Sequence, residues 1–297
     1  MEILVLGGTR LIGVHVVEEL LNRGHQVTIA NRGLSKDPFS DRVKRLVIER
    51  TDPEDLQHKL MDRSYDLVYD SLAYCSLDVK ALLDAVGCRH YTMISSASVY
   101  TIKENLREEE FDPCTYPLKW CHREEYPYDE IKRQAECALF QSYQDRQAAA
   151  IRFPYVIGRD DYTKRLYFYV EHVVKGIPMH IDNLKEQLSF ISSEEAGAYV
   201  AWAGLQGITG TFNASGRGTI SLEEVLRYVE EKTGRKAILQ PEGEPGPYNG
   251  APSFSLDTSR SEALGFSFKA IEEFLYTILD FYMEEARREL PMQSFRI

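Results

Sequence analysis

The sequence predicts an α/β fold in which a doubly wound parallel sheet is joined to a smaller C-terminal lobe that binds the substrate. Up to about residue 155, short apolar runs alternate with segments of helical spacing. This alternation is typical of parallel strands that helices cover on both faces. Beyond it the pattern is less regular. We therefore expect a sheet domain over residues 1–155 and a lobe mainly over 156–297, with a segment of about 188–215 returning to the sheet domain.

The apolar runs define the expected strands, which are Ile3–Leu6, Gln26–Ala30, Arg45–Glu49, Asp66–Asp70, His90–Ser95 and Ala148–Phe153. Amphipathic segments between several of them define the expected helices, which are Leu11–Arg23, Pro53–Met61, Leu77–Val86 and Tyr128–Tyr143. Ligands of such sheets bind at the carboxyl ends of the strands.

The C-terminal part predicts four more helices, which are Lys164–Lys175, Ser193–Ala203, Ser221–Lys232 and Ile271–Arg287. Ser221 and Glu224 have the spacing of a capping box at the start of the third of these. Residues 241–252, "PEGEPGPYNGAP", are rich in proline and glycine, and we expect them to form a loop.

The composition is that of an ordinary globular protein, with 43% hydrophobic and 27% charged residues. No apolar run reaches the ~18–20 residues that cross a bilayer, and the start lacks the basic stretch of a signal peptide. The five cysteines form no C-x-x-C pair and have no metal-ligand spacing with the histidines. We therefore expect a cytoplasmic protein with reduced thiols, no metal site and no membrane partner.

The net charge of −11 speaks against a broad surface for nucleic acid, because phosphate binding needs clustered Lys and Arg. A small anionic ligand can still bind where a few arginines and helix N-termini face it. The expected partner is a small-molecule substrate.

A glycine turn follows the first strand in "LVLGGTRLIG", residues 4–13. A glycine at the turn allows a tight bend, and a glycine early in the helix lets it pack close to the strand. The free N–H groups of the following helix then face a pyrophosphate. The turn predicts a Rossmann-type dinucleotide site that includes Gly7, Thr9, Arg10, Leu11, Ile12 and Gly13.

The end of the second strand predicts the cofactor. An acidic residue at this point would favour NAD, but the sequence has Asn31 and Arg32 there. A guanidinium suits a 2′-phosphate, so we assign both residues to an NAD(P) site that favours NADP. Arg10 stands where the motif has its middle glycine, and we hypothesise that Arg10 and Arg32 bracket the 2′-phosphate. The alternative for Arg32 is a solvated loop charge.

A candidate acid/base pair lies in "YPYDEIKRQAE", residues 126–136. Tyr128 and Lys132 are four residues apart, so they share one face of a helix. We expect the cation to lower the phenol pKa from ~10 by roughly one to three units, which gives an acid/base near neutrality. A hydroxyl from "MISSASVY", residues 93–100, would hold the substrate oxygen. The alternative is a surface pair, which Tyr-x-x-x-Lys often is.

Together these motifs are similar to those of the extended, or atypical extended, short-chain dehydrogenases/reductases of the NAD-dependent epimerase/dehydratase family. The resemblance covers nearly the whole chain. It implies a Rossmann sheet with a small substrate lobe, and it is compatible with a homodimer. The matching stretches are "GGTRLIG", "ISSASVY", "YDEIKRQAE", "IRFPYVIGRDD", "FISSEEAGAYV" and "TFNASGRGTISLEEV".

The resemblance also implies roles for individual residues. The catalytic residues of the family match Ser96, Tyr128 and Lys132, and the tyrosine and lysine positions also border the nicotinamide end of the cofactor. Leu72 and Ala73 match backbone that lines the cofactor. An acidic residue that bonds the adenine amine in relatives is either Glu49 or Asp52 here.

The sequence departs from the family at positions that concern the substrate. The acidic pair of the nucleotide-sugar dehydratases is replaced by Ala97 and Ser98, which disfavours 4,6-dehydration. The asparagine with which UDP-sugar epimerases grip a diphosphate is replaced by Tyr155, and an arginine just before the strand in "LSFIS" is missing. The basic residues nearby either bind an anionic substrate group or are solvated, and they are Lys164, Arg165 and Arg217.

Two functions follow from the sequence. The first is hydride transfer between NAD(P) and a carbonyl or alcohol carbon of a small sugar-like or nucleotide-sugar substrate, with a tyrosine as acid/base. The sequence does not separate an epimerase from a reductase. The alternative is a non-catalytic nucleotide sensor or an RNA-binding relative of the chloroplast stem-loop-binding proteins. The oligomeric state stays open.

Overall fold

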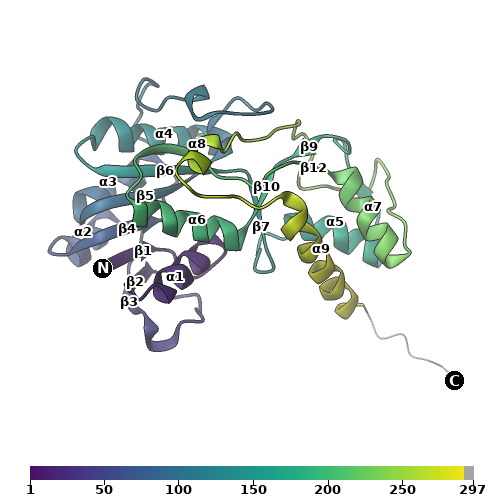
Figure 1. The fold of residues 1–297 in the computed structure, drawn as a ribbon, viewed down its shortest axis with the longest axis horizontal. Coiled ribbons are helices and arrows are strands. Elements are labelled where there is room, and N and C mark those ends of the chain that lie inside the picture. The colour runs from purple at the N-terminus through teal and green to yellow at the C-terminus, as the bar shows by residue number, and fades with distance from the viewer. Residues whose placement is uncertain (291–297) are drawn as a thin grey trace.

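A seven-stranded parallel sheet forms the centre of the computed structural model, which describes residues 1–290 (Figure 1). The strand order is β11-β6-β5-β4-β1-β2-β3, and each neighbouring pair is parallel. This order confirms the predicted doubly wound fold. The strands are β1 (Glu2–Leu6), β2 (Gln26–Asn31), β3 (Lys44–Val47), β4 (Ser64–Asp70), β5 (Gly87–Ser96), β6 (Gln147–Phe153) and β11 (Gly210–Asn213).

Helices cover both faces of the sheet because the strand side chains alternate between two apolar cores. In β1, Ile3 and Val5 belong to one core, and Leu4 and Leu6 belong to the other. On the first face lie α1 (Ile12–Asn22) and α6 (Ser193–Gln206), which pack against each other. On the second face lie α2 (Pro53–Leu60), α3 (Ser76–Ala85) and α4 (Tyr128–Ser142).

The expected elements agree closely with these bounds. The six predicted strands are the first six of the sheet, and the predicted helices differ from the observed ones by at most three residues at an end. The seventh strand, β11, was missed, because its four residues begin with a glycine and carry little apolar pattern. The capping box is present, since Ser221 Oγ accepts a hydrogen bond from Glu224 N at 3.2 Å and Glu224 Oε2 accepts one from Ser221 N at 2.9 Å.

Apart from α8, the remaining helices and strands form the lobe that lies beside the sheet in Figure 1. Its main helices are α5 (Arg165–Lys175), α7 (Leu222–Thr233) and α9 (Ile271–Arg288), which enclose a third apolar core. Its short strands are β7 (Tyr155–Ile157), β8 (Met179–His180), β9 (Gln187–Leu188), β10 (Phe190–Ser192), β12 (Ile220–Ser221) and β13 (Glu244–Pro245). The five-residue helix α8 (Ser259–Ala263) packs against β11.

Residues 241–252 are irregular as expected, except for the two residues of β13, which pair with β8. This pairing holds the loop on the lobe. Its last residues, with Phe254 beyond them, form part of the cleft described below.

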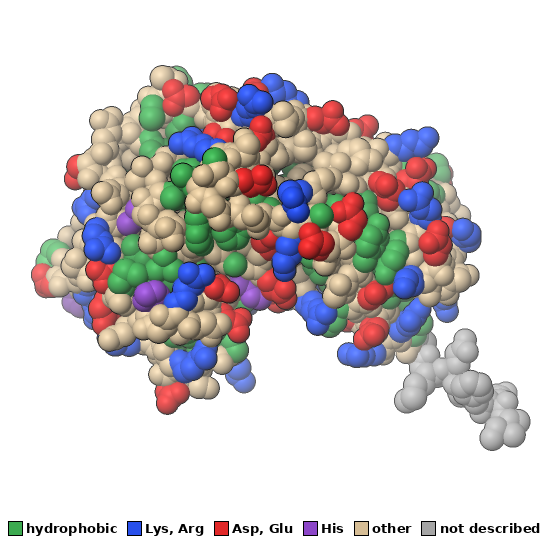
Figure 2. All heavy atoms as spheres, viewed as in Figure 1, with side chains coloured by type: hydrophobic (Ala, Val, Ile, Leu, Met, Phe, Trp, Pro, Cys, Tyr) green, Lys and Arg blue, Asp and Glu red, His purple; other side chains and the backbone are tan. Residues whose placement is uncertain are grey.

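On the face shown in Figure 2, acidic and basic side chains are interspersed, and no broad basic area gathers among the coloured atoms. Within residues 1–290, no helix combines the length and the apolar character needed to cross a membrane.

One buried ion pair joins the sheet to α4. Arg152 in β6 and Glu136 in α4 are both fully buried, and Arg152 Nη2 lies 2.6 Å from Glu136 Oε2. Arg152 also donates to the backbone carbonyls of Glu108 at 2.8 Å and Phe111 at 3.0 Å. Burial opposes the charge on Arg152, but Glu136 outweighs it and raises the arginine pKa. The pair therefore connects β6, α4 and the segment after β5.

Removal of this arginine is expected to destabilise the whole fold. Arg152→Met leaves Glu136 buried without its cation, and the free energy of unfolding should fall by about 3–5 kcal/mol. Urea unfolding followed by circular dichroism measures this loss. The matched control is Arg288→Met, whose ion pair with Glu284 is exposed at 76% and 63% and should contribute less than about 1 kcal/mol. An equal effect of the two substitutions would contradict the importance of the buried pair.

Candidate active site

A cleft of about 1240 Å³ opens at the carboxyl ends of the sheet strands. Its lining comes from the turns after β1, β2 and β4, from the ends of β5 and β6, and from the start of α4. The chain reverses its winding direction between β1 and β4, which is the point where ligands bind in such sheets. The cleft holds every predicted site residue except Ala73, and those that line it are Gly7, Thr9, Arg10, Leu11, Ile12, Gly13, Asn31, Arg32, Leu72, Ser96, Tyr128 and Lys132.

The glycine turn has the backbone that only glycine adopts easily. Gly7 and Gly8 have φ angles of +92° and +78°, and a Cβ on Gly7 would lie 2.3 Å from Ser71 Oγ. A Cβ on Gly13 would lie 2.8 Å from the backbone nitrogen of Gly8. Leu11, which precedes α1, also has a positive φ of 46°, a strain that is typical of ligand-binding turns.

Asn31 supports this turn from the end of β2. Its Nδ2 donates to Gly7 O at 3.5 Å, and its Oδ1 accepts from Gly33 N at 2.7 Å. Because α1 begins at Ile12, the N–H groups of its first turn have no carbonyl partner within the helix. Two of them bond carbonyls just before the helix, Gly13 N to Arg10 O at 3.0 Å and Val14 N to Leu11 O at 3.2 Å, which leaves Ile12 N for an anion at this edge of the cleft.

The two arginines assigned to the 2′-phosphate are both exposed. The guanidinium carbon of Arg10 lies 5.4 Å from the ring centre of Tyr162, a residue of the segment between β7 and α5. Arg32 lies close enough to Glu49 for its charge to contribute to the lowered pKa of that carboxyl, after the larger effect of hydrogen bonds from Thr51. Their joint action on a phosphate remains a hypothesis.

The structure separates the two candidates for the adenine contact. Glu49 lines the cleft, whereas Asp52 does not. Asp52 is the N-cap of α2 and accepts hydrogen bonds from Glu54 N at 3.0 Å and Asp55 N at 3.2 Å. Asp52 therefore has a local structural task, and Glu49 is the carboxylate that faces the cleft.

Ser96 and Tyr128 lie together on one wall of the cleft. Ser96 ends β5 and Tyr128 is the first residue of α4. The Ser96 hydroxyl accepts a hydrogen bond from Ser98 N at 3.1 Å, so its own proton is free to bond Tyr128 or a substrate oxygen. The neighbouring Ser95 points into the buried network, where its hydroxyl donates to Glu136 at 2.5 Å. This difference distinguishes Ser96 from Ser95 as the residue that can touch a ligand.

The expected lowering of the Tyr128 pKa is not found. Half of the side chain is exposed, but desolvation of the phenol in the cleft raises its pKa and outweighs the hydrogen bond with Ser96 and the charge of Arg165, both of which lower it. The Lys132 ammonium is bonded to two backbone carbonyls.

Lys132 is only 3% exposed and is held by two carbonyl oxygens. Its Nζ donates to Ala73 O at 2.8 Å and to Ile94 O at 3.0 Å, and it lies 4.8 Å from the ring centre of Tyr74. Burial lowers the lysine pKa to about 8. An ammonium has three N–H donors, so one remains for a ligand. Ala73 itself is fully buried and does not line the cleft, and its carbonyl oxygen holds the Lys132 ammonium.

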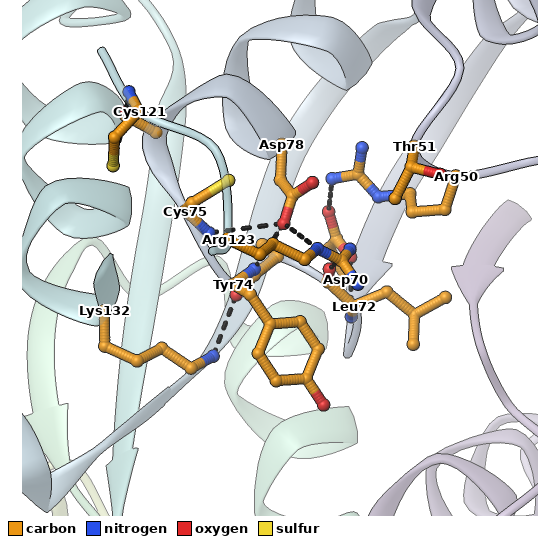
Figure 3. Close-up of polar contacts among 12 residues, drawn as sticks. Arg50, Thr51, Asp70, Leu72, Tyr74, Cys75, Asp78, Cys121, Arg123 and Lys132 are labelled. Carbon is orange, nitrogen blue, oxygen red and sulfur yellow. Dashed lines mark hydrogen bonds and ion pairs between the residues drawn. The ribbon is translucent and has the colours of Figure 1, made fainter. Parts of the chain in front are cut away.

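A second cation, Arg123, was missed in the sequence. It comes from an irregular segment before α4 and donates to Asp78 Oδ2 and to Leu72 O, both at 2.9 Å (Figure 3). Its guanidinium carbon lies 4.7 Å from the ring centre of Tyr74, so Tyr74 lies between Arg123 and Lys132. No motif marks Arg123, because only the fold brings it to the turn after β4.

Arg50 was missed as well. It pairs with Asp70 at 2.7 Å (Figure 3), both side chains are buried, and Arg50 lines the cleft. Asp70 also accepts a hydrogen bond from Tyr91 at 3.0 Å. The pair connects the turn after β3 to the end of β4. The sequence around Arg50 does not indicate that the arginine has a buried carboxylate partner.

None of the three positions at which the sequence departs from the family pattern, Ala97, Ser98 and Tyr155, has an acidic side chain. Ala97 is buried, and Ser98 Oγ is buried without a hydrogen-bond partner in residues 1–290. Tyr155 packs against Tyr248, with ring centres 4.4 Å apart, and against Phe254 at 5.4 Å. The substrate side of the cleft therefore has an aromatic wall. No group of three potential metal ligands gathers in the part of the chain that the structure describes.

Comparison with known proteins finds a family resemblance for the first part of the chain. Residues 3–81 match the model of the NAD dependent epimerase/dehydratase family. The structure of the Thermus thermophilus UDP-glucose 4-epimerase in complex with NAD has a TM-score of 0.71 with 21% identity, over 95% of this chain and 99% of that one. The resemblance to the epimerase/dehydratase family is confirmed. The matched segment contains the glycine turn and the ends of β2 and β4.

Curated relatives match shorter segments. The chloroplast stem-loop binding protein of 41 kDa b from Arabidopsis thaliana is 31% identical over 129 residues, which are 38% of this chain and 34% of the relative. The 2'-dehydrokanamycin reductase of Streptomyces kanamyceticus is 29% identical over 99 residues, 33% of this chain and 28% of the relative. The matches thus span about a third of the curated relatives. The proteins that this chain is similar to thus include an epimerase solved with NAD and a reductase.

The glycine turn provides a direct test of the cofactor site. Gly13→Ala would push a methyl group against the backbone of Gly8, and we expect the affinity for NADPH to fall by roughly tenfold or more. The control is Gly24→Ala just beyond the other end of α1, where φ is +77° but no atom lies within 4 Å. It should lower Tm and leave NADPH affinity unchanged. Fluorescence titration and thermal unfolding separate the two effects, and unchanged binding in Gly13→Ala would contradict the assignment.

Proposed function

We propose that this chain is an NAD(P)-dependent oxidoreductase or epimerase. It transfers a hydride at a carbonyl or alcohol carbon of a small sugar-like or nucleotide-sugar substrate, with Tyr128 as the acid/base. The observation that carries the proposal is that Ser96, Tyr128 and Lys132 line the same cleft as the glycine turn. A dinucleotide bound on the turn would therefore extend toward the tyrosine.

A nicotinamide dinucleotide fits the residues present. The tight turn after β1 needs glycines, because Cβ atoms there would collide with neighbouring protein atoms, and Ile12 N at the start of α1 is left for a pyrophosphate in the same cleft. Glu49 lines the far part of the cleft and would meet the adenine. The third N–H of Lys132 would bond the nicotinamide ribose. When bound, the cofactor supplies or accepts the hydride.

The protein residues would hold the substrate oxygen and move the proton. In a reduction, the Tyr128 hydroxyl donates its proton to the carbonyl oxygen as the hydride adds to the carbon. The raised pKa keeps the phenol protonated at neutral pH, which is the form that a reduction needs. Ser96, beside Tyr128, would donate a hydrogen bond to the same oxygen. In the reverse direction the phenol takes the proton back.

The outcome depends on what happens after the first transfer. If the cofactor stays bound and the oxidised intermediate rotates, so that the hydride returns to its other face, the product is an epimer. If the cofactor leaves, the net reaction is a reduction or an oxidation. The reductase among the relatives supports the second course, and the UDP-glucose 4-epimerase fold supports the first. The absence of an acidic pair at Ala97 and Ser98 argues against dehydration of a nucleotide sugar.

The similarity to the chloroplast stem-loop binding protein supports a second candidate, a non-catalytic nucleotide sensor or RNA-binding protein. The net charge of −11 and the complete Ser, Tyr and Lys set argue against it. Acid extraction of the purified protein tests both. Release of a dinucleotide supports the enzyme, whereas co-purified RNA supports the second candidate.

Tyr128 is expected to be essential for turnover and dispensable for cofactor binding. Tyr128→Phe should lower kcat by about 10²–10⁴-fold, because the proton donor is lost, and leave NADPH affinity almost unchanged. A panel of keto sugars and nucleotide sugars, followed by NAD(P)H absorbance and isomer analysis, provides the assay. The control is Tyr126→Phe, two residues earlier and also exposed. An active Tyr128→Phe enzyme would remove this tyrosine from the mechanism.

The cofactor preference is expected to follow Arg32. The unmodified protein should bind NADPH more tightly than NADH, and Arg32→Glu should reduce NADPH affinity by roughly tenfold because it repels the 2′-phosphate. Arg10→Gly should cause a smaller but selective loss. The control is Arg42→Glu, which is exposed and outside the cleft. Equal or tighter binding of NADH by the unmodified protein would contradict the preference for NADP.

A further inference from the structure

The cleft is cationic although the chain is strongly acidic. Two carboxylates line it, Glu49 and Asp129, and Asp129 is already paired with Arg133 at 2.9 Å. The net charge of the whole chain is −11. The concentration of positive charge in the cleft selects for anionic ligands. The cationic side chains of the lining are Arg10, Arg32, Arg50, Arg123, Lys132 and Arg165.

Half of these cations have partners within the protein. Arg50 pairs with Asp70, Arg123 pairs with Asp78, and Lys132 is held by two carbonyl oxygens. The other three, Arg10, Arg32 and Arg165, make no ion pair with residues 1–290. Arg10 and Arg32 lie on the turns after β1 and β2, at the cofactor end. Arg165 belongs to a different part of the cleft.

Arg165 lies on the substrate side, next to the aromatic wall. It is the first residue of α5, and its guanidinium carbon lies 5.7 Å from the ring centre of Tyr155 and 6.0 Å from that of Tyr248. Its Nε donates to Thr163 Oγ1 at 3.4 Å, so the two terminal nitrogens are free to bind a ligand. Arg165 and Tyr128 line the same cleft, and the two are close enough for the charge of Arg165 to act on the phenol pKa.

The two neighbouring candidates from the sequence lie elsewhere. Lys164 lies 3.8 Å from Glu285 on α9 and 4.0 Å from Glu289 just after it, and it does not line the cleft. Arg217 is joined through its backbone to Lys269 and does not line the cleft. Of the three, only Arg165 can meet a substrate.

We propose that Arg165 binds an anionic oxygen group of the substrate, a carboxylate or a phosphate, while the reacting carbon lies at Tyr128. This inference rests on the proposed function. A planar guanidinium group binds either anion through two parallel hydrogen bonds. Arg165 therefore favours a negatively charged group and accepts both a carboxylate and a phosphate. The part of the substrate between the two ends lies against Tyr155 and Phe254, where an apolar ring face can stack.

The test uses the protein saturated with NADPH, so that the phosphate sites of the cofactor are filled. Isothermal titration measures the binding of benzoate, inorganic phosphate, UDP and the neutral analogue benzamide. We expect at least one anion to bind about tenfold more tightly than benzamide, and Arg165→Ala to abolish that advantage. Benzoate as the preferred probe indicates a carboxylate substrate, and phosphate or UDP indicates a phosphorylated one.

The control is Arg159→Ala, which removes an exposed arginine outside the cleft and should leave all affinities unchanged. Arg165→Lys should retain part of the advantage, because it keeps the charge and loses the paired donors. NADPH affinity should be the same in every variant. Anion binding that Arg165→Ala leaves intact, or equal binding of anions and benzamide, would overturn the inference.

Failure of the proposed function is visible separately. If the protein binds neither NADPH nor NADH, the proposed enzyme is contradicted, and the same titrations are made on the protein alone. Anion binding that requires Arg165 would then still support an anion site at this position.

Discussion

The buried contact between Arg152 and Glu136 positions the rest of the site. Arg152 belongs to β6 and Glu136 to α4, one helical turn after Lys132. Glu136 also accepts the hydroxyl of Ser95, which immediately precedes Ser96. A single charged pair therefore fixes α4 against the ends of β5 and β6. Because a buried charge needs its partner, this arrangement tolerates little movement, which is what a proton donor and a hydroxyl need if they are to meet one oxygen atom.

The need of a buried charge for partners also applies to Lys132. A buried ammonium is costly unless hydrogen bonds compensate for lost water. Two carbonyls supply these bonds, one from the turn after β4 and one from β5. The lysine thus connects the turn after β4 and strand β5 to the helix that carries Tyr128.

The charges divide the molecule into an acidic exterior and a cationic cleft. Pairs such as Arg50 with Asp70 and Arg123 with Asp78 stabilise the walls, because each arginine neutralises a carboxylate in or near them. The arginines without such partners are at the two ends of the cleft. This separation allows one end to hold a dinucleotide and the other to select the substrate, without a broad basic surface on the protein.

The sequence by itself determined the doubly wound sheet, the glycine turn and the spacing of Tyr128 and Lys132. These features depend on neighbours along the chain, through apolar alternation, backbone freedom and helical periodicity, so local patterns reveal them. Only the tertiary structure decided that Glu49 and not Asp52 faces the cleft, that Arg165 lies in the cleft while Lys164 does not, and that Arg123 reaches the turn after β4. These outcomes depend on contacts between segments far apart in the chain, and a charged residue in a loop has the same local pattern whether its partner is water or a buried carboxylate.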